Sequence, residues 1–332
     1  MGAQSREARK YYAEVDEKCK TIAAYSRNLN LNYLQGKLSP CYHRDEAIRN
    51  IQKILLRRNK ANVLLTGRAG CGKTAVVEGL AAVITESKLW YIQSCAKAEA
   101  AYKRALKKWE DNGRKGEKPA QVDPHKPPLC DCVIYDLSLN GMVGGTRYRG
   151  EFEQRIDAVI KECRNNPNII LFIDEIHHMC VIGASESSVS TGQILKPALA
   201  RKDVCVIGAT TLEEKAEIYK DKALARRFSE LELSELGNNA ATDTAANILR
   251  DYCAYHQIST SVSSAHLLSC VQHYLPGTVF PDNFINVVDE TLASAVLDGF
   301  PAVDMSHFTT TLSRMTGQII LCAEECPASQ AG

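Results

Sequence analysis

The stretch that decides the fold is Val63-Leu64-Leu65-Thr66-Gly67-Arg68-Ala69-Gly70-Cys71-Gly72-Lys73-Thr74. An apolar run precedes a glycine-rich turn, and the Lys-Thr pair opens a helical pattern, so the stretch matches G-x-x-x-x-G-K-[ST] in the setting that this motif requires. Glycines let backbone N–H groups turn inward around phosphates, and the following helix presents its positive end to the same anion. A glycine turn with a solvated lysine is the alternative interpretation.

The motif predicts a nucleotide-binding loop. We expect Lys73 to reach the β- and γ-phosphates and Thr74 to place its hydroxyl on Mg²⁺. The residues predicted to bind the nucleotide through this loop are Gly67, Arg68, Ala69, Gly70, Cys71, Gly72, Lys73 and Thr74.

A second apolar run, Ile169 to Ile173, ends in the carboxylates Asp174 and Glu175. An open parallel sheet places its ligand site at this end of its strands. We therefore expect Asp174 to hold Mg²⁺, usually through water, and Glu175 to orient and polarise the attacking water. A solvated strand end is the alternative.

Length and composition exclude several classes of protein. The chain has 332 residues, room for about two domains, and 40 basic against 39 acidic side chains, so no charge excess attracts a polyanion. Its longest aliphatic runs are too short to span a bilayer, and its first twenty residues fit neither a secretory signal nor a transit peptide. The 13 scattered cysteines indicate reduced thiols without a metal site. We therefore expect the protein to be located in the cytoplasm.

The order of patterns predicts an α/β fold. Strand patterns at 63–65, 132–135, 169–173 and 204–207 alternate with helical patterns, including one over 73–86, which indicates a parallel, buried central sheet. After residue 239 the periodicity becomes helical to about 320. We expect a helical N-terminal arm over 1–37, a large α/β subdomain over 38–235, a small all-α lid over 236–321 and a tail over 322–332.

A basic insert over residues 95–128 interrupts the compact pattern. It contains a helical stretch with Lys103, Arg104, Lys107 and Lys108, followed by a loop interrupted by prolines. Two interpretations remain open: a solvated surface helix with its loop, or an element that docks a partner.

Further motifs resemble a known family. The stretch Gly145-Thr146-Arg147-Tyr148-Arg149-Gly150-Glu151-Phe152-Glu153-Gln154-Arg155, together with the motifs above, resembles the AAA+ ATPases, and within them the first ATPase module of the Clp unfoldases and disaggregases (ClpA, ClpB and ClpC type). The resemblance runs from about residue 22 to 320. It implies a P-loop NTPase fold. It also implies that Arg147 and Tyr148 line the axial channel of a ring of subunits, where the aromatic side chain of Tyr148 can press on any polypeptide. If the resemblance is set aside, the alternative interpretation is that Tyr148 is an ordinary tyrosine in a loop.

The resemblance extends to Gly208-Ala209-Thr210-Thr211-Leu212 and Ala223-Leu224-Ala225-Arg226-Arg227-Phe228. The first is similar to the family's sensor-1 turn, which implies that Thr211 hydrogen-bonds near the γ-phosphate or its water. The second is similar to the segment with arginine fingers, which implies that Arg226 and Arg227 act on the nucleotide of a neighbouring subunit, since a guanidinium in trans neutralises charge on the transferred phosphoryl group. An oligomer, expected to be a hexamer, is then part of the active site. If the resemblance is set aside, the alternative interpretation is that Arg226 and Arg227 are two solvated basic residues at the surface.

Two other segments bear on the nucleotide. Near the adenine the family has Val-Ile-Gly-Arg where this chain has Cys41-Tyr42-His43-Arg44, so we expect Tyr42 and His43 at the base, with His43 in place of a glycine. The stretch 280–290 is similar to the family's Leu-Pro-Asp-Lys-Ala-Ile-Asp segment in the lid. These 332 residues contain no counterpart of the family's amino-terminal substrate domain, coiled-coil middle domain or second ATPase ring.

The leading interpretation is a Mg²⁺-dependent ATPase, with ATP/ADP and Mg²⁺ as cofactors, that forms a ring and remodels or translocates a protein substrate through its pore. The alternative is a nucleotide-gated adaptor or assembly factor of a larger machine with weak hydrolysis. A DNA-directed AAA+ loader is a third reading, which the near-neutral charge opposes. We expect no specific nucleic acid and no membrane insertion.

Overall fold

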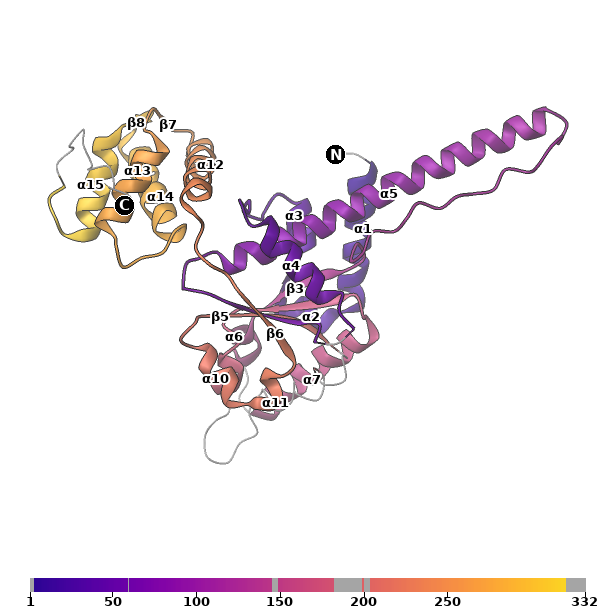
Figure 1. The fold of residues 1–332 in the computed structure, drawn as a ribbon, viewed down its shortest axis with the longest axis horizontal. Helices are drawn as coiled ribbons and strands as arrows, with labels where there is room; N and C mark the ends of the chain where they lie inside the picture. Colours follow the sequence, from indigo (N-terminus) through magenta and orange to yellow (C-terminus); the bar gives the residue numbers. More distant parts are fainter. Residues whose placement is uncertain (1–2, 59, 145–148, 182–198, 200–203, 321–332) are drawn as a thin grey trace. The chain divides into compact units, whose positions relative to one another are not determined.

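The computed structural model describes residues 3–58, 60–144, 149–181, 199 and 204–320 (Figure 1). The chain divides into two compact units, each described here by itself. The first comprises Met1–Thr66 and Thr74–Leu231, and the second Gly67–Lys73 and Glu232–Gly332.

A mostly parallel sheet organises the first unit. Within the described residues it has six strands in the order β1-β3-β4-β5-β2-β6. Their bounds are β1 Ser26–Asn28, β2 Asn62–Thr66, β3 Val133–Leu137, β4 Ile169–Ile173, β5 Cys205–Thr210 and β6 Phe228–Glu232. The pairs β2–β5, β3–β4 and β4–β5 are parallel, and β1 pairs antiparallel with β3. Every residue of β2 and β4 is buried, which is why β4 and the centre of β2 appear in the sequence as apolar runs. The predicted α/β fold is confirmed.

Helices pack on this sheet through their apolar faces. Those described in the first unit are α1 Ala3–Lys18, α2 Lys20–Tyr25, α3 Leu29–Leu34, α4 Asp45–Leu55, α5 Lys73–Asp111, α6 Leu139–Val143, α7 Arg149–Asn165, α8 His178–Val181, α10 Lys215–Lys220 and α11 Lys222–Ala225. Helices α2 and α3 contact β3, and α4 contacts β2. The buried face of α4 carries isoleucines at positions 48, 51 and 54, the helical spacing seen in the sequence.

The N-terminal segment is part of the sheet domain. It is mostly helical, as expected for residues 1–37, but Tyr12 and Ile22 are fully buried in the core that surrounds the sheet. Its strand β1 forms the sheet edge, with Arg27 opposite Asp136 in the β1–β3 register. A three-residue strand is too short to produce a period-2 signal, so the sequence did not predict it.

Helix α5 differs from the prediction. We expected a helix over 73–86 and a separate basic helix in the insert, whereas one helix of 39 residues runs from Lys73 to Asp111. The prediction of a break was wrong because no glycine or proline occurs between Gly79 and Asn112, so nothing interrupts the backbone hydrogen bonds. The first part of the insert, residues 95–111, is therefore a continuation of the helix that follows the glycine-rich loop.

The second unit contains a small helical domain. Its helices are α12 Asn238–His256, α13 Ser264–Tyr274, α14 Asp282–Asp298 and α15 Met305–Thr316. Their apolar sides meet in a core that includes Leu267, Phe284, Leu292 and Phe308, each fully buried. The prediction that the chain after the α/β part is helical is confirmed. Two short strands, β7 Ser259–Thr260 and β8 Ala302–Val303, pair in parallel between the helices and were not predicted.

Two negative expectations concern the described residues only. None of the helices there combines the length and apolarity that a bilayer crossing needs. The ten cysteines described carry no disulfide, and no group of three or more His, Cys, Asp or Glu side chains in this part of the chain is arranged to hold a metal ion.

A buried amide holds the N-terminal segment to the sheet. Asn30 is fully buried; its Oδ1 accepts a hydrogen bond from the backbone N–H of Ile134 in β3 at 2.8 Å, and its Nδ2 donates to Thr85 Oγ1 in α5 at 2.9 Å. Three elements thus meet at one side chain. Inside a core, a donor that loses its partner loses the whole compensation for its desolvation.

We expect Asn30→Ala to lower the free energy of unfolding by about 2–4 kcal/mol, because it leaves the Ile134 N–H and the Thr85 hydroxyl without this partner. Urea unfolding monitored by circular dichroism measures the change. The matched control is Asn112→Ala at an exposed position, expected to shift stability by less than about 0.5 kcal/mol. Equal stability of the two variants would contradict the role of Asn30.

Candidate functional site

The glycine-rich loop joins the end of β2 to the start of α5, as the motif requires. Gly70 and Gly72 have φ angles of +79° and +90°, in the region that side chains rarely adopt. A Cβ on Gly67 would lie 2.8 Å from the carbonyl oxygen of Leu233. The loop therefore needs glycine at these positions, independently of any bound group.

Lys73 is folded onto its own loop. Its Nζ donates hydrogen bonds to the carbonyl oxygens of Gly67 at 2.9 Å and Arg68 at 3.0 Å. The ammonium group thus lies over the loop whose backbone would surround a phosphate chain. Arg68 forms an ion pair with Glu235 at 2.7 Å in the same unit.

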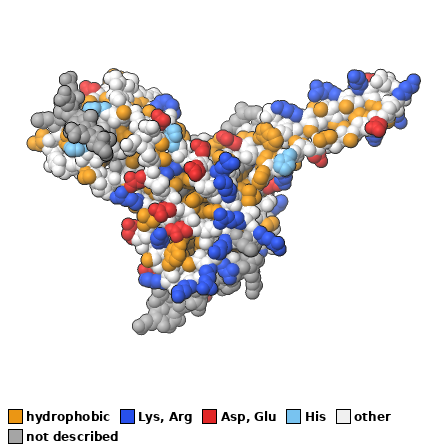
Figure 2. All heavy atoms as spheres, in the orientation of Figure 1, with side chains coloured by type: hydrophobic (Ala, Val, Ile, Leu, Met, Phe, Trp, Pro, Cys, Tyr) orange, Lys and Arg blue, Asp and Glu red, His pale blue; other side chains and the backbone are white. Residues whose placement is uncertain are grey.

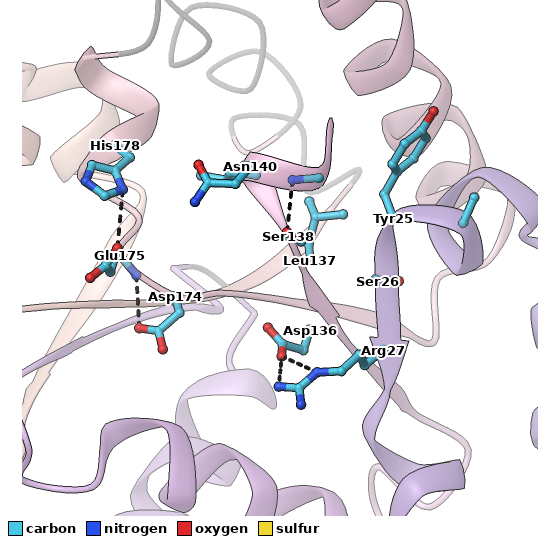
Figure 3. Close-up of a pocket in the computed structure, with 13 residues that line it drawn as sticks. Tyr25, Ser26, Arg27, Asp136, Leu137, Ser138, Asn140, Asp174, Glu175 and His178 are labelled. Carbon is cyan, nitrogen blue, oxygen red and sulfur yellow. Dashed lines mark hydrogen bonds and ion pairs between the residues drawn. The ribbon is translucent and has the colours of Figure 1, made fainter. Parts of the chain in front are cut away.

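The helix start and the carboxylate strand are joined directly. The hydroxyl of Thr74, the second residue of α5, donates to Asp174 Oδ2 at 2.8 Å. Asp174 follows the last residue of β4, and its Oδ1 accepts the backbone N–H of Glu175 at 2.9 Å, as drawn in Figure 3. A hydroxyl and a carboxylate this close form a set of hard oxygen ligands of the kind that Mg²⁺ prefers. The two residues predicted as metal ligands are therefore brought together.

Glu175 has a backbone conformation that is uncommon for a side-chain-bearing residue. Its φ is +49°, which for a glutamate costs about 1 kcal/mol or more and persists only where neighbouring contacts impose it. The exposed carboxylate lies 3.4 Å from His178 Nδ1. The next residue, Ile176, donates its backbone N–H to the carbonyl of Ala209 in β5 at 2.9 Å. The turn after β4 is thus held on the neighbouring strand.

A hydrogen-bonded cluster connects this turn with Thr211, the predicted sensor residue. Thr211 Oγ1 donates to Glu214 Oε2 at 2.8 Å, and the same oxygen lies 3.3 Å from Nδ1 of the buried His177. His177 also lies 3.1 Å from Thr210 Oγ1. Burial alone would raise the pKa of Glu214, but the hydrogen bond from Thr211 and the nearby His177 hold it below its usual value. The sequence analysis missed Glu214; its place three residues after Thr211, one helical turn away, was the available signal.

A pocket of about 700 Å³ opens beside Asp174 and Glu175 (Figure 3). On its other side, Arg27 Nε donates to Asp136 Oδ2 at 3.0 Å, and the Nη2 of the same arginine bonds to that oxygen. Burial raises the pKa of Glu78 on α5, an effect that Arg27 opposes and Asp136 reinforces. Sequence reasoning did not find Arg27 or Asp136, because the antiparallel strand β1 that brings them together was not predicted. The lining of the pocket therefore includes the carboxylates of Asp136, Asp174 and Glu175 and the guanidinium of Arg27.

Arg226 and Arg227 lie near the amino-terminal ends of the parallel strands, opposite the ends that Asp174 and Thr211 follow. Both are exposed and line a separate cavity of about 370 Å³. That cavity is also lined by residues at the start of three parallel strands: Asn62, Ile170 and Cys205. Asp174, in contrast, follows the carboxyl end of β4. The structure therefore does not bring the two arginines to Asp174 and Glu175 of the same chain.

The remaining predicted residues are only partly placed. Tyr42 and His43 directly follow Cys41, which packs closely on α5: a Cβ added to Gly79 of that helix would lie 2.9 Å from the Cβ of Cys41. His43 has a φ of +53°, which explains why a glycine suits this position in the family that the sequence resembles. Arg147 and Tyr148, predicted to line a pore, lie outside the described residues.

The chain is similar in sequence to known proteins over the residues that form the sheet and the candidate site. The AAA family, described as the ATPase family associated with various cellular activities, matches residues 63–236. The chaperone protein ClpB of Wolinella succinogenes is 36% identical over 283 residues, which cover 84% of this chain and 28% of that protein. ClpB of Meiothermus ruber is 37% identical over 274 residues, covering 82% of this chain and 28% of its own. The chain thus spans little more than a quarter of the length of these relatives.

Solved structures agree with these relatives. The Hsp104–ADP complex of S. cerevisiae superimposes with a TM-score of 0.69 at 28% identity, over 89% of this chain and 45% of that chain. A closed-state structure of Hsp104 with ATPγS and FITC casein gives a TM-score of 0.70 at 28% identity, over 90% of this chain and 45% of that chain. The predicted resemblance is confirmed: with a family match over more than half of its residues, including the glycine-rich loop and Asp174-Glu175, the chain belongs to the AAA family of ATPases.

Proposed function

We propose that this protein hydrolyses ATP and, as a ring of identical subunits, moves or remodels a polypeptide. The observation that carries the proposal is the 2.8 Å hydrogen bond between Thr74 and Asp174, which joins the helix after the phosphate loop to the strand that ends in Glu175. Binding of a nucleotide follows from membership of an ATPase family; hydrolysis coupled to work on a protein is the further step.

Within one subunit, each residue has a separate task. Lys73 exchanges its bonds to the loop carbonyls for bonds to the β- and γ-phosphates, a replacement of two neutral acceptors by stronger anionic ones. Glu175, beside Asp174, orients a water and accepts its proton. Thr211 moves its hydroxyl from Glu214 towards the γ-phosphate or that water. Mg²⁺, held by Thr74 and Asp174, would neutralise charge on the phosphate oxygens.

The active site is completed by a neighbouring subunit. Arg226 and Arg227 lie near the amino-terminal ends of the parallel strands, whereas Asp174 of the same chain follows the carboxyl end of β4. The pocket beside Asp174 and Glu175 has room for side chains from outside the chain. A guanidinium inserted there would stabilise charge on the transferred phosphoryl group. We propose a homo-oligomer, with six subunits as the expected number.

The substrate is proposed to be a protein. The matched relatives are named chaperones, and a matched Hsp104 structure contains casein. In such a ring, Arg147 and Tyr148 would grip the polypeptide, the tyrosine through an apolar face that does not depend on sequence. We expect the protein to act in the cytoplasm, without specific nucleic acid.

Glu175→Gln is expected to keep ATP bound while slowing hydrolysis about 10²–10⁴-fold, because the amide cannot accept the proton of the attacking water. Phosphate release and retention of a fluorescent ATP analogue measure the two effects. Glu213→Gln, an exposed neighbour of Thr211, is the matched control and should hydrolyse ATP at the wild-type rate. Near-normal turnover of Glu175→Gln would refute the assignment, and weak hydrolysis by the wild type itself would favour the adaptor alternative.

Two inactive variants should restore activity when mixed. The double variant Arg226→Ala/Arg227→Ala keeps Glu175, and Glu175→Gln keeps both arginines, so a shared interface between the two kinds of subunit contains one complete site. We expect each variant alone to be nearly inactive and the mixture to regain part of the wild-type rate. Lys222→Ala in the same region should retain activity. A mixture as inactive as its components would sink the proposal of a shared site.

Tyr148→Ala tests the work on protein separately from hydrolysis. We expect basal ATP turnover to stay within about twofold of wild type while unfolding of labelled casein is lost, because removing the ring removes the grip and leaves the nucleotide site intact. Tyr255→Ala, at a tyrosine that is 81% exposed in α12, is the control. Unchanged casein unfolding by Tyr148→Ala would count against translocation and for the adaptor reading.

A further inference from the structure

The second half of α5 extends beyond the core of its own unit. The last buried residue of the helix is Thr85, and Ile92 is the last that packs against the core. From Gln93 to Asp111 the helix continues for about 28 Å at 1.5 Å per residue, and Figure 1 shows this part projecting from the sheet, with the chain returning alongside it. We call residues 93–128 the basic hairpin.

One side of the hairpin helix is already covered. Half-buried residues recur along it at spacings of three and four: Cys95, Ala98, Tyr102, Leu106 and Trp109. In the returning chain Pro119, Pro124 and Pro127 are half-buried, and Trp109 Nε1 donates to the Gly116 carbonyl at 3.1 Å. The apolar stripe is thus partnered within the hairpin.

The base of the hairpin is anchored by Asp131. Its carboxylate pairs with Lys88 of α5 at 2.7 Å and with Lys126 of the returning chain, and Tyr11 donates to its backbone carbonyl at 2.7 Å. These contacts fix both arms of the hairpin to the sheet domain. The outer face of the helix is consequently presented in a defined direction.

The outer face is cationic. Five exposed basic residues lie within twelve positions: Lys97, Lys103, Arg104, Lys107 and Lys108. Glu99 is the single carboxylate between Gln93 and Lys108, and it pairs with Lys103 at 2.5 Å. No carboxylate of the described residues forms an ion pair with the other four. Lys and Arg side chains are visible along this segment in Figure 2.

The charge is concentrated in the hairpin. Residues 93–118 contain eight basic and four acidic side chains, whereas the whole chain has a formal charge of +1, so the remaining residues together are net acidic. Small residues, Ala96 and Ala100, lie one turn apart among the exposed positions. Small side chains between long cations allow another helix to approach the backbone closely.

Geometry favours a protein over a duplex nucleic acid as the partner. A helix with an extended chain packed along it is wider than the 10–12 Å of a single helix, so it does not fit the roughly 12 Å major groove. Glu110, Asp111 and Glu117 at the tip would also repel a phosphate backbone. From these observations we infer that the basic hairpin is a docking surface for an acidic helix of a partner protein, whose carboxylates meet Lys97, Arg104 and Lys108 along one line and Lys103 and Lys107 along the next.

The test measures binding of a designed acidic helix to the full chain by fluorescence anisotropy at low salt. The probe is a labelled Ala/Glu peptide of about 20 residues, or about 30 Å, with its glutamates on one face. We expect saturable binding that the fourfold charge reversal K103E/R104E/K107E/K108E weakens at least ~10-fold, and that increasing salt weakens as well. The corresponding fourfold alanine variant, which preserves the helix, should lose affinity to a smaller extent.

The control reverses four exposed lysines elsewhere in the same unit, at positions 18, 20, 53 and 161, and should keep affinity within about twofold. All variants should retain wild-type basal ATP turnover, since none of these residues belongs to the nucleotide site. Equal binding of a peptide of the same composition with its glutamates on all faces would overturn the inference. Tighter binding of a DNA duplex of about 20 base pairs, lost in the same charge-reversal variant, would also overturn it and identify a nucleic-acid surface.

Discussion

Burial of β4 on both faces is the constraint on which the rest of the first unit depends. An apolar strand inside a parallel sheet must run in the direction of its neighbours, so Asp174 and Thr211 leave β4 and β5 at the same edge. The hydrogen bond from Thr74 to Asp174 then ties the start of α5 to that edge. The start of α5, Asp174 and Glu175 are close together because β2, β4 and β5 are parallel, and not because their positions in the sequence are near.

The same topology separates Arg226 and Arg227 from the carboxylates. The segment that carries them precedes β6 and reaches the sheet at the edge where β2, β4 and β5 begin. The carboxyl ends and the amino ends of the parallel strands lie on opposite sides of the sheet. Side chains at these two ends of the strands in one chain therefore cannot both reach a single phosphate. The position of these two arginines at the opposite end of the strands from Asp174 is the physical basis of the proposed ring.

Helix α5 is continuous from the glycine-rich loop to the proposed docking surface. Its first turn places Thr74 beside Asp174 in the candidate site, and its outer half carries the cationic face of the basic hairpin. Asp131, Lys88 and Tyr11 hold the helix to the returning chain and to α1 where the two halves meet. A partner that docks on the outer half would therefore contact the same continuous helix that begins at the phosphate loop, without an intervening flexible joint.

The sequence by itself determined the α/β class, strands β2 and β4 to within a residue or so, the glycine-rich loop and the Asp174-Glu175 pair, because these depend on local composition and on runs of buried residues. It could not predict β1, whose three residues show no periodicity, nor the contacts of Arg27 with Asp136, of Asn30 with Ile134 and of His177 with Glu214, which depend on pairing between distant segments. It also placed a break in α5 where composition changes, although no residue there interrupts a helix. Which edge of the sheet receives each functional side chain was decided only by the tertiary structure, because strand order and direction follow from how the whole set of apolar faces packs together.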